Sequence, residues 1–146
     1  MNQTTFGFGP HLMLDLYGCN KEKLNDLQFI YNFLDKLPSE IGMTKIAPPQ
    51  ITSYPGKETS FDKGGISAFV LIAESHIVIH TFVEQEHAFV DIFSCKNFDM
   101  EHAEKVIVEA LEAKKVDKYL NNRGVEFPKI IPLATQIVKE ERKTIN

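Results

Sequence analysis

A short run of reactive side chains interrupts the most hydrophobic part of the chain. Residues 73–80 read Ala-Glu-Ser-His-Ile-Val-Ile-His, with a serine, a glutamate and two histidines among branched apolar residues. Polar groups are costly to bury unless they are paired, so this run needs either partners or a function. One interpretation is structural, with Ser75, His76 and His80 simply hydrogen-bonded inside the protein. Because several such residues cluster here, a role in a chemical reaction is favoured over a purely structural role.

A metal site is the first chemistry to consider for the two histidines. On a helix, His76 and His80 would share one face and could chelate zinc. The surrounding residues instead predict a strand, where each residue rises ~3.3 Å and positions four apart are separated by about 13 Å. Two imidazoles at that separation cannot share one ion, so no bound metal is expected.

A serine hydrolase would need Ser75 beside a histidine and an acid. The chain has no Gly-x-Ser-x-Gly sequence, which forms the turn that exposes the nucleophile in α/β-hydrolases. Strand alternation also places Ser75 and His80, which are five residues apart, on opposite faces of a sheet. Either the strand bends between them, or each of them meets its partners from a different subunit.

Hydrophobic patterns predict the elements that must hold these residues. Alternating apolar positions and crowded β-branched residues are typical of strands. Strand patterns cover residues 11–17, 66–83, 88–94 and 116–120, and a loop over 47–65 has room for one short strand near 50–54. Apolar residues at helical spacing predict one helix between Asn20 and Pro38 and another after a cap at Asp99. The order β-α-β-β-β-α-β predicts an α+β two-layer sandwich, an antiparallel sheet covered by helices on one face.

Composition is typical of one ordinary domain. The 146 residues are 43% hydrophobic and 25% charged, so a single domain over 1–146 is expected, with 125–146 as a C-terminal appendage. The net charge of −4, without a dense basic cluster in the main part of the chain, argues against nucleic-acid binding. No apolar run approaches the ~20 residues that span a bilayer, and the N-terminal segment lacks a signal-peptide pattern. A cytoplasmic protein without a membrane partner is therefore expected.

The two cysteines, Cys19 and Cys95, call for separate interpretations. They lie far apart and form no Cys-x-x-Cys pair, which argues against a disulfide framework and against a thiolate metal site. A free cysteine most often acts as a small buried hydrophobe, and this is the expectation for Cys19.

Three segments of the chain resemble a known family. Residues 71–81 read Leu-Ile-Ala-Glu-Ser-His-Ile-Val-Ile-His-Thr, residues 90–95 read Val-Asp-Ile-Phe-Ser-Cys, and residues 11–19 begin with His-Leu and end with Asp-Leu-Tyr-Gly-Cys. They resemble the small prokaryotic S-adenosylmethionine decarboxylases, and the resemblance extends from His11 to Gly124. It implies the same α+β two-layer fold and a homodimer of processed αβ protomers, with the active sites at the subunit interface.

The resemblance implies a proenzyme that cleaves itself between Glu74 and Ser75. The Ser75 hydroxyl would attack the Glu74 carbonyl carbon, and elimination from the resulting ester would lead to a pyruvoyl group on residue 75. This covalent pyruvoyl group would be the cofactor, without a metal and without pyridoxal phosphate. His80 matches the processing proton acceptor of the family, and Ser67 matches a serine that supports processing.

The resemblance also implies how the processed enzyme would act. Cleavage would give a β chain of residues 1–74 and an α chain of residues 75–146. The pyruvoyl group would form a Schiff base with the substrate amino group and accept the electrons released as carbon dioxide leaves. Cys95 matches the family's general acid, which returns a proton to the α carbon.

The substrate-binding residues implied by the resemblance are Phe61, Phe82 and Glu84. They match aromatic residues that stack on adenine and a carboxylate that accepts from the ribose hydroxyls. Many family members have Trp-Pro after His-Thr, where this chain has Phe82-Val83. The expected function is decarboxylation of S-adenosylmethionine to the aminopropyl donor of spermidine biosynthesis. A pyruvoyl-dependent arginine or ornithine decarboxylase and a non-processing regulatory paralogue are the alternatives.

Overall fold

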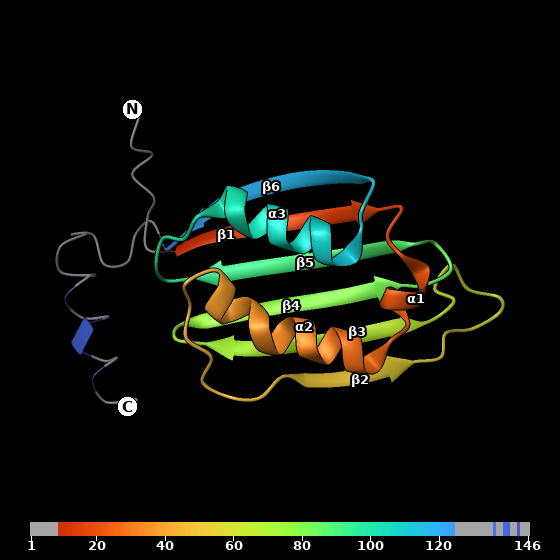
Figure 1. The fold of residues 1–146 in the computed structure, drawn as a ribbon, viewed down its shortest axis with the longest axis horizontal. Coiled ribbons are helices and arrows are strands. Elements are labelled where there is room, and N and C mark those ends of the chain that lie inside the picture. Colours follow the sequence, from red (N-terminus) through yellow and green to blue (C-terminus); the bar gives the residue numbers. More distant parts are fainter. Residues whose placement is uncertain (1–8, 125–135, 137–138, 141–142, 144–146) are drawn as a thin grey trace.

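One antiparallel sheet with helices on one of its faces forms the fold (Figure 1). The computed structural model describes residues 9–124, together with residues 136, 139, 140 and 143. The predicted two-layer α+β architecture is confirmed. The appendage expected over 125–146 lies outside the described residues, apart from those four. Among the described residues, no helix is both long and apolar enough to cross a membrane.

Six strands pair in the spatial order β2-β3-β4-β5-β1-β6, and every neighbouring pair is antiparallel. The strands are β1 (Gly9–Tyr17), β2 (Gln50–Tyr54), β3 (Gly65–Ile72), β4 (Ser75–Phe82), β5 (His87–Ser94) and β6 (Lys115–Arg123). The helices are α1 (Lys21–Leu24), α2 (Leu27–Glu40) and α3 (Met100–Leu111).

The observed order adds one strand and one short helix to the predicted order. Residues 50–54 pair along their whole length with β3, so they form a full strand of the sheet. The first predicted helix is divided in two because Asn25 ends α1 and the Asp26 side chain accepts from the backbone N–H of Phe29, which caps α2. The most β-like segment, 66–83, folds as the β3–β4 hairpin.

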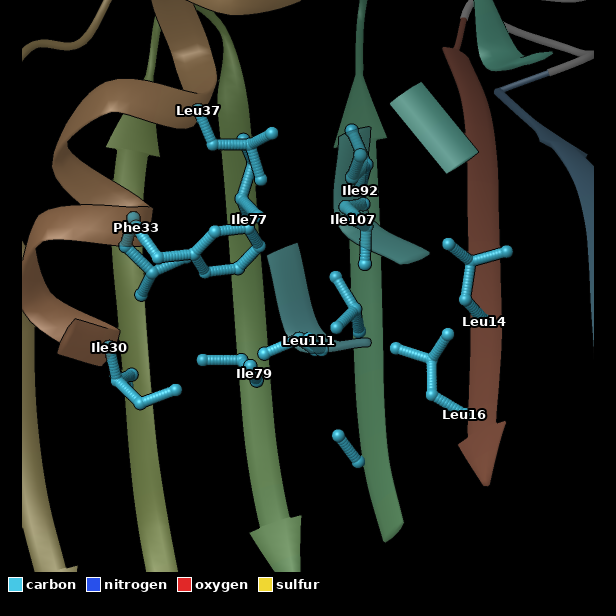
Figure 2. Packing of buried hydrophobic residues seen from close by; sticks show 14 of the residues in the cluster. Leu14, Leu16, Ile30, Phe33, Leu37, Ile77, Ile79, Ile92, Ile107 and Leu111 are labelled. Atoms are coloured by element: carbon cyan, nitrogen blue, oxygen red, sulfur yellow. The ribbon is translucent and has the colours of Figure 1, made fainter. Parts of the chain in front are cut away.

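The hydrophobic core lies between the sheet and the two longer helices (Figure 2). Alternate strand residues and one side of each helix are buried together, and burial of each large apolar side chain contributes ~1.5–3 kcal/mol. The residues labelled in Figure 2 are Leu14, Leu16, Ile30, Phe33, Leu37, Ile77, Ile79, Ile92, Ile107 and Leu111. A shift of one residue would expose the buried face of a strand, so this core fixes the register.

The face of the sheet opposite α2 and α3, which we call the open face, carries the other half of the strand side chains. On β3 and β4 these include Ser67, Phe69, Leu71 and His80, which alternate with buried residues. Phe69 and Leu71 are each 41% exposed. Large apolar side chains exposed together on a sheet are typical of a surface that binds another molecule.

Candidate active site

Ser75 is the first residue of β4 and follows the Ala73-Glu74 turn that joins β3 to β4. Its φ angle is 115°, a backbone conformation that costs a residue with a side chain about 1–3 kcal/mol. A hydrogen bond holds the first residue of the turn, because the Ala73 N–H donates to the Thr44 carbonyl at 2.9 Å. Residues held in such conformations cluster at functional sites.

Cys95 lies beside Ser75 at the same end of the sheet. The β4–β5 ladder pairs Ser75 with Ser94, and Cys95 is the next residue. Ser75 Oγ lies 3.5 Å from Cys95 Sγ. The backbone N–H of Cys95 donates to the Glu74 carbonyl oxygen at 3.3 Å. A hydroxyl, a thiol and a polarised carbonyl group therefore meet at this turn.

The bend that carries Cys95 is held by its two neighbours. Ser94 is buried, and its hydroxyl accepts from the Lys96 backbone N–H at 3.1 Å. Lys96 Nζ donates to the Gly42 carbonyl at 3.1 Å, which ties this bend to the segment after α2. No pattern in the sequence points to these supporting residues, because Lys96 and Gly42 belong to no motif and meet only in the folded chain.

Ser67 and His80 form a second group, on the open face. They are register partners across the β3–β4 ladder, and Ser67 Oγ lies 2.9 Å from His80 Nδ1. This contact occupies Nδ1 and orients the ring, so Nε2 is the nitrogen that can exchange a proton with another group. The two residues that the family resemblance assigns to processing therefore contact each other within one hairpin.

His80 does not reach Ser75 within one protomer. The ladder between β4 and β5 is continuous from Ser75 to Phe82, so the strand does not bend between the two residues. Five residues of extended strand separate them by about 16 Å. A bend in the strand between Ser75 and His80 is therefore excluded, which leaves partners from a different subunit.

Phe61, Phe82 and Glu84 gather at the end of the sheet opposite Ser75. Phe82 ends β4, Glu84 lies in the turn to β5, and Phe61 lies in the loop before β3 (right side of Figure 1, with the β3–β4 turn at the left). Gln85 Nε2 donates to the Phe61 carbonyl, which joins that loop to the turn. The rings of Phe82 and Phe89 meet edge to face with centroids 5.4 Å apart. Phe61 itself is 73% exposed.

Cys19 has a different environment from Cys95. Its side chain is buried, with 3% exposure, and its N–H donates to the Glu86 carbonyl at 3.0 Å. Burial and, to a smaller extent, the Glu86 carboxylate raise the pKa of the Cys19 thiol to about 11. A neutral, enclosed thiol acts as a small hydrophobe, and the prediction for Cys19 is confirmed.

The comparison with protein families decides what kind of molecule carries this arrangement. The family model described as S-adenosylmethionine decarboxylase matches residues 10–124. The chain belongs to the S-adenosylmethionine decarboxylase family. Membership places it among the carboxy-lyases, and it confirms the family resemblance seen in the three sequence segments.

Relatives in this decarboxylase family match over most of the chain. The S-adenosylmethionine decarboxylase proenzyme of Thermodesulfovibrio yellowstonii is 34% identical over 141 residues, which cover 96% of this chain and 98% of the relative. The proenzyme of Anoxybacillus flavithermus is 35% identical over 124 residues, which cover 80% of this chain and 88% of the relative. The crystal structure of the adenosylmethionine decarboxylase from Aquifex aeolicus has a TM-score of 0.67 at 29% identity, covering 82% of this chain and 93% of that chain.

Proposed function

We propose that the chain is a self-processing, pyruvoyl-dependent decarboxylase of S-adenosylmethionine that supplies the aminopropyl donor for spermidine biosynthesis in the cytoplasm. One observation carries the proposal: the Ser75 hydroxyl, the Cys95 thiol and the polarised Glu74 carbonyl meet at one turn. These are the groups that self-cleavage at Glu74–Ser75 and later proton donation require. Cleavage there yields a β chain of residues 1–74 and an α chain of residues 75–146 within a single domain.

Self-cleavage begins when Ser75 Oγ attacks the carbonyl carbon of Glu74. The peptide C–N bond breaks as the C–O bond of an ester forms, and the freed amino group stays on residue 75. The Cys95 N–H, 3.3 Å from the Glu74 oxygen, is placed to stabilise the negative charge that develops on this oxygen. Residue 75 then loses its α proton, and the ester breaks to release the new C-terminal carboxylate of Glu74. This elimination leaves dehydroalanine at residue 75. Water converts it to a pyruvoyl group and releases ammonia.

His80 is the proposed acceptor of the α proton in this elimination. Ser67 holds His80 Nδ1 at 2.9 Å, which leaves Nε2 to take the proton. Because His80 of the same protomer is about 16 Å from Ser75, the acceptor has to come from a second copy of the chain.

A homodimer packed through the open face supplies that second copy. The exposed Phe69 and Leu71 give this face apolar surface to bury. In a symmetric dimer the same patch is used by both copies. A two-fold axis that runs across the strands, between the two sheets, places the Ser75 end of each copy over the Phe82 end of the other. Cys95 follows the buried Ser94 and so lies on the open face, and Ser75 Oγ, at the irregular start of β4, lies 3.5 Å from its thiol. Each active site then combines Ser75 and Cys95 of one copy with His80 of the second.

In turnover, the pyruvoyl group would supply the electron sink for decarboxylation, the role that pyridoxal phosphate has in other enzymes. The residues at the turn fit such a group, because Cys95 Sγ already lies 3.5 Å from the Ser75 side chain. The thiol is placed to donate a proton to the carbon that has lost its carboxylate. Phe61 and Phe82 offer aromatic surface for adenine, and Glu84 offers a carboxylate for the ribose hydroxyls.

Carbon dioxide release from the processed protein tests this function directly. S-adenosylmethionine, arginine and ornithine are compared in parallel, and faster release from S-adenosylmethionine is expected. Glu84→Gln should raise KM for S-adenosylmethionine, because an amide accepts from a diol less well than a carboxylate does. Faster release from arginine or ornithine contradicts the proposal, and so does an unchanged KM in Glu84→Gln.

A further inference from the structure

Lys21 holds the carboxylate that is proposed to bind ribose. Lys21 is the first residue of α1, and its Nζ lies 3.0 Å from Glu84 Oε2. In Figure 1, α1 lies at the same end of the sheet as the β4–β5 turn that carries Glu84. The side chains are 46% and 58% exposed, so a ligand can reach the pair. Because a carboxylate has two oxygens, one can accept from a hydroxyl while Lys21 holds the other.

We propose that Lys21 is a specificity-determining residue. It orients Glu84 so that the carboxylate accepts from a neutral diol, and it cancels the negative charge that would attract a cationic side chain. This inference rests on the proposed function, in which Glu84 accepts from the ribose. It adds that the ammonium group of Lys21 sets which class of substrate Glu84 can recognise.

Charge explains why the pair distinguishes the two classes of substrate. A ribose diol binds by donating hydrogen bonds, and one carboxylate oxygen can accept them while an ammonium group holds and orients the other oxygen. The distal guanidinium of arginine or ammonium of ornithine binds through net negative charge as well. The Lys21–Glu84 pair has none to offer, and Lys21 repels a cation that binds at Glu84 itself. The sulfonium of S-adenosylmethionine is attached to C5′ of the ribose and does not take the place of the hydroxyls at Glu84. The pair therefore favours the nucleoside over the basic amino acids.

Lys23 provides a matched control on the same helix. Its Nζ lies 3.0 Å from Glu112 Oε2, at the end of α3. The two lysines thus have the same side chain, the same helix and the same ion-pair distance, but only Lys21 contacts Glu84. Lys23→Met measures what the loss of one such lysine costs in stability and folding. Lys21→Arg tests whether a positive donor at position 21 is sufficient.

The experiment uses the processed enzyme obtained from the full-length chain. It measures kcat and KM for S-adenosylmethionine and the inhibition constants for arginine and ornithine. Lys21→Met should raise KM by about two- to fivefold, as expected for a partly exposed ion pair, and leave kcat nearly unchanged. Its inhibition constants for arginine and ornithine should fall. Lys21→Arg and Lys23→Met should match the wild type in all four constants.

The outcomes separate this inference from the function on which it rests. Normal turnover of S-adenosylmethionine by the wild type, with an unchanged KM and unchanged inhibition in Lys21→Met, overturns the role of Lys21 alone. Equal effects of Lys21→Met and Lys23→Met overturn it too, because the effect would then come from losing any lysine of α1. A wild type that releases no carbon dioxide from S-adenosylmethionine contradicts the proposed function and the inference together.

Discussion

The backbone N–H of Cys95 donates to the carbonyl oxygen of Glu74 at 3.3 Å. The bond proposed to be cut is therefore polarised by the residue proposed to act after the cut. In the proposed function, Cys95 would serve the two stages through different atoms, the N–H in self-cleavage and the thiol in decarboxylation. Because a change of side chain leaves the N–H in place, mutation separates the two roles.

Cys95→Ala should still cleave to some extent but lose most of its decarboxylase activity. A general acid contributes about 10²–10⁴ in rate, so a loss of this order is expected. Chain masses measure cleavage, and carbon dioxide release measures turnover. Cys19→Ala is the control. Cys19 lies at the other end of the sheet, where its backbone N–H donates to the Glu86 carbonyl, so this variant should keep both activities. Unchanged turnover in Cys95→Ala would remove the thiol from the mechanism.

His80→Ala should stop processing after the ester has formed. The acceptor of the α proton is then missing, while Ser75 and the Cys95 N–H that act in the first step are intact. Treatment with hydroxylamine should cleave the accumulated ester into two chains. His102, which contacts the Glu40 carbonyl from α3, provides a control histidine whose replacement should leave processing normal. Ordinary processing by His80→Ala would make His80 a structural residue.

Two inactive variants should restore processing when they are combined in one dimer. Chains with His80→Ala and chains with Ser75→Ala are coexpressed with different tags, and the mixed dimer is isolated. In a shared site, the Ser75→Ala chain supplies His80 to the Ser75 of the other chain. The His80→Ala chain should then be fully processed in the mixed dimer only. A mixed dimer without processed chains would show that the site does not combine Ser75 and His80 from two copies.

Stability should fall at alkaline pH through Cys19. Its thiol has a pKa of about 11 in the folded chain, whereas an exposed thiol titrates near ~8.5. The stabilisation from this neutral thiol is fully present below about pH 8.5 and is lost as the pH rises toward 11, because the unfolded chain loses its proton first. Urea unfolding at about pH 8 and about pH 10 should show a smaller pH-dependent loss for Cys19→Ala than for the wild type. Equal losses in both proteins contradict this assignment.

The sequence predicts the fold where side-chain patterns are strong. Alternation of Leu12, Leu14 and Leu16 marks β1, and the strand predicted around His76 and His80 is observed as β4. Strand alternation also shows that Ser75 and His80, five residues apart, lie on opposite faces and cannot meet within one straight strand. Each of these predictions rests on residues that are close in sequence.

Other features have a weak local signal in the sequence or none. β2 is mostly exposed and shows no alternation, so the sequence allows a short strand near 50–54 but does not show that it pairs along its whole length with β3. The bond from Cys95 to the Glu74 carbonyl depends on the register of β4 and β5, because it joins backbone atoms of two separate motifs. The contact between Lys21 and Glu84 joins a helix and a distant turn and can be seen only in three dimensions.

Intact-mass spectrometry of the purified protein and of its Ser75→Ala variant tests self-cleavage between Glu74 and Ser75. The wild type should give two chains, 1–74 and 75–146. The second chain should be lighter than its unmodified sequence by one molecule of ammonia, as a pyruvoyl end requires. Ser75→Ala should give one full-length chain. A wild type of full-length mass alone, or a Ser75→Ala protein that is still cleaved after Glu74, would contradict self-processing through the Ser75 hydroxyl.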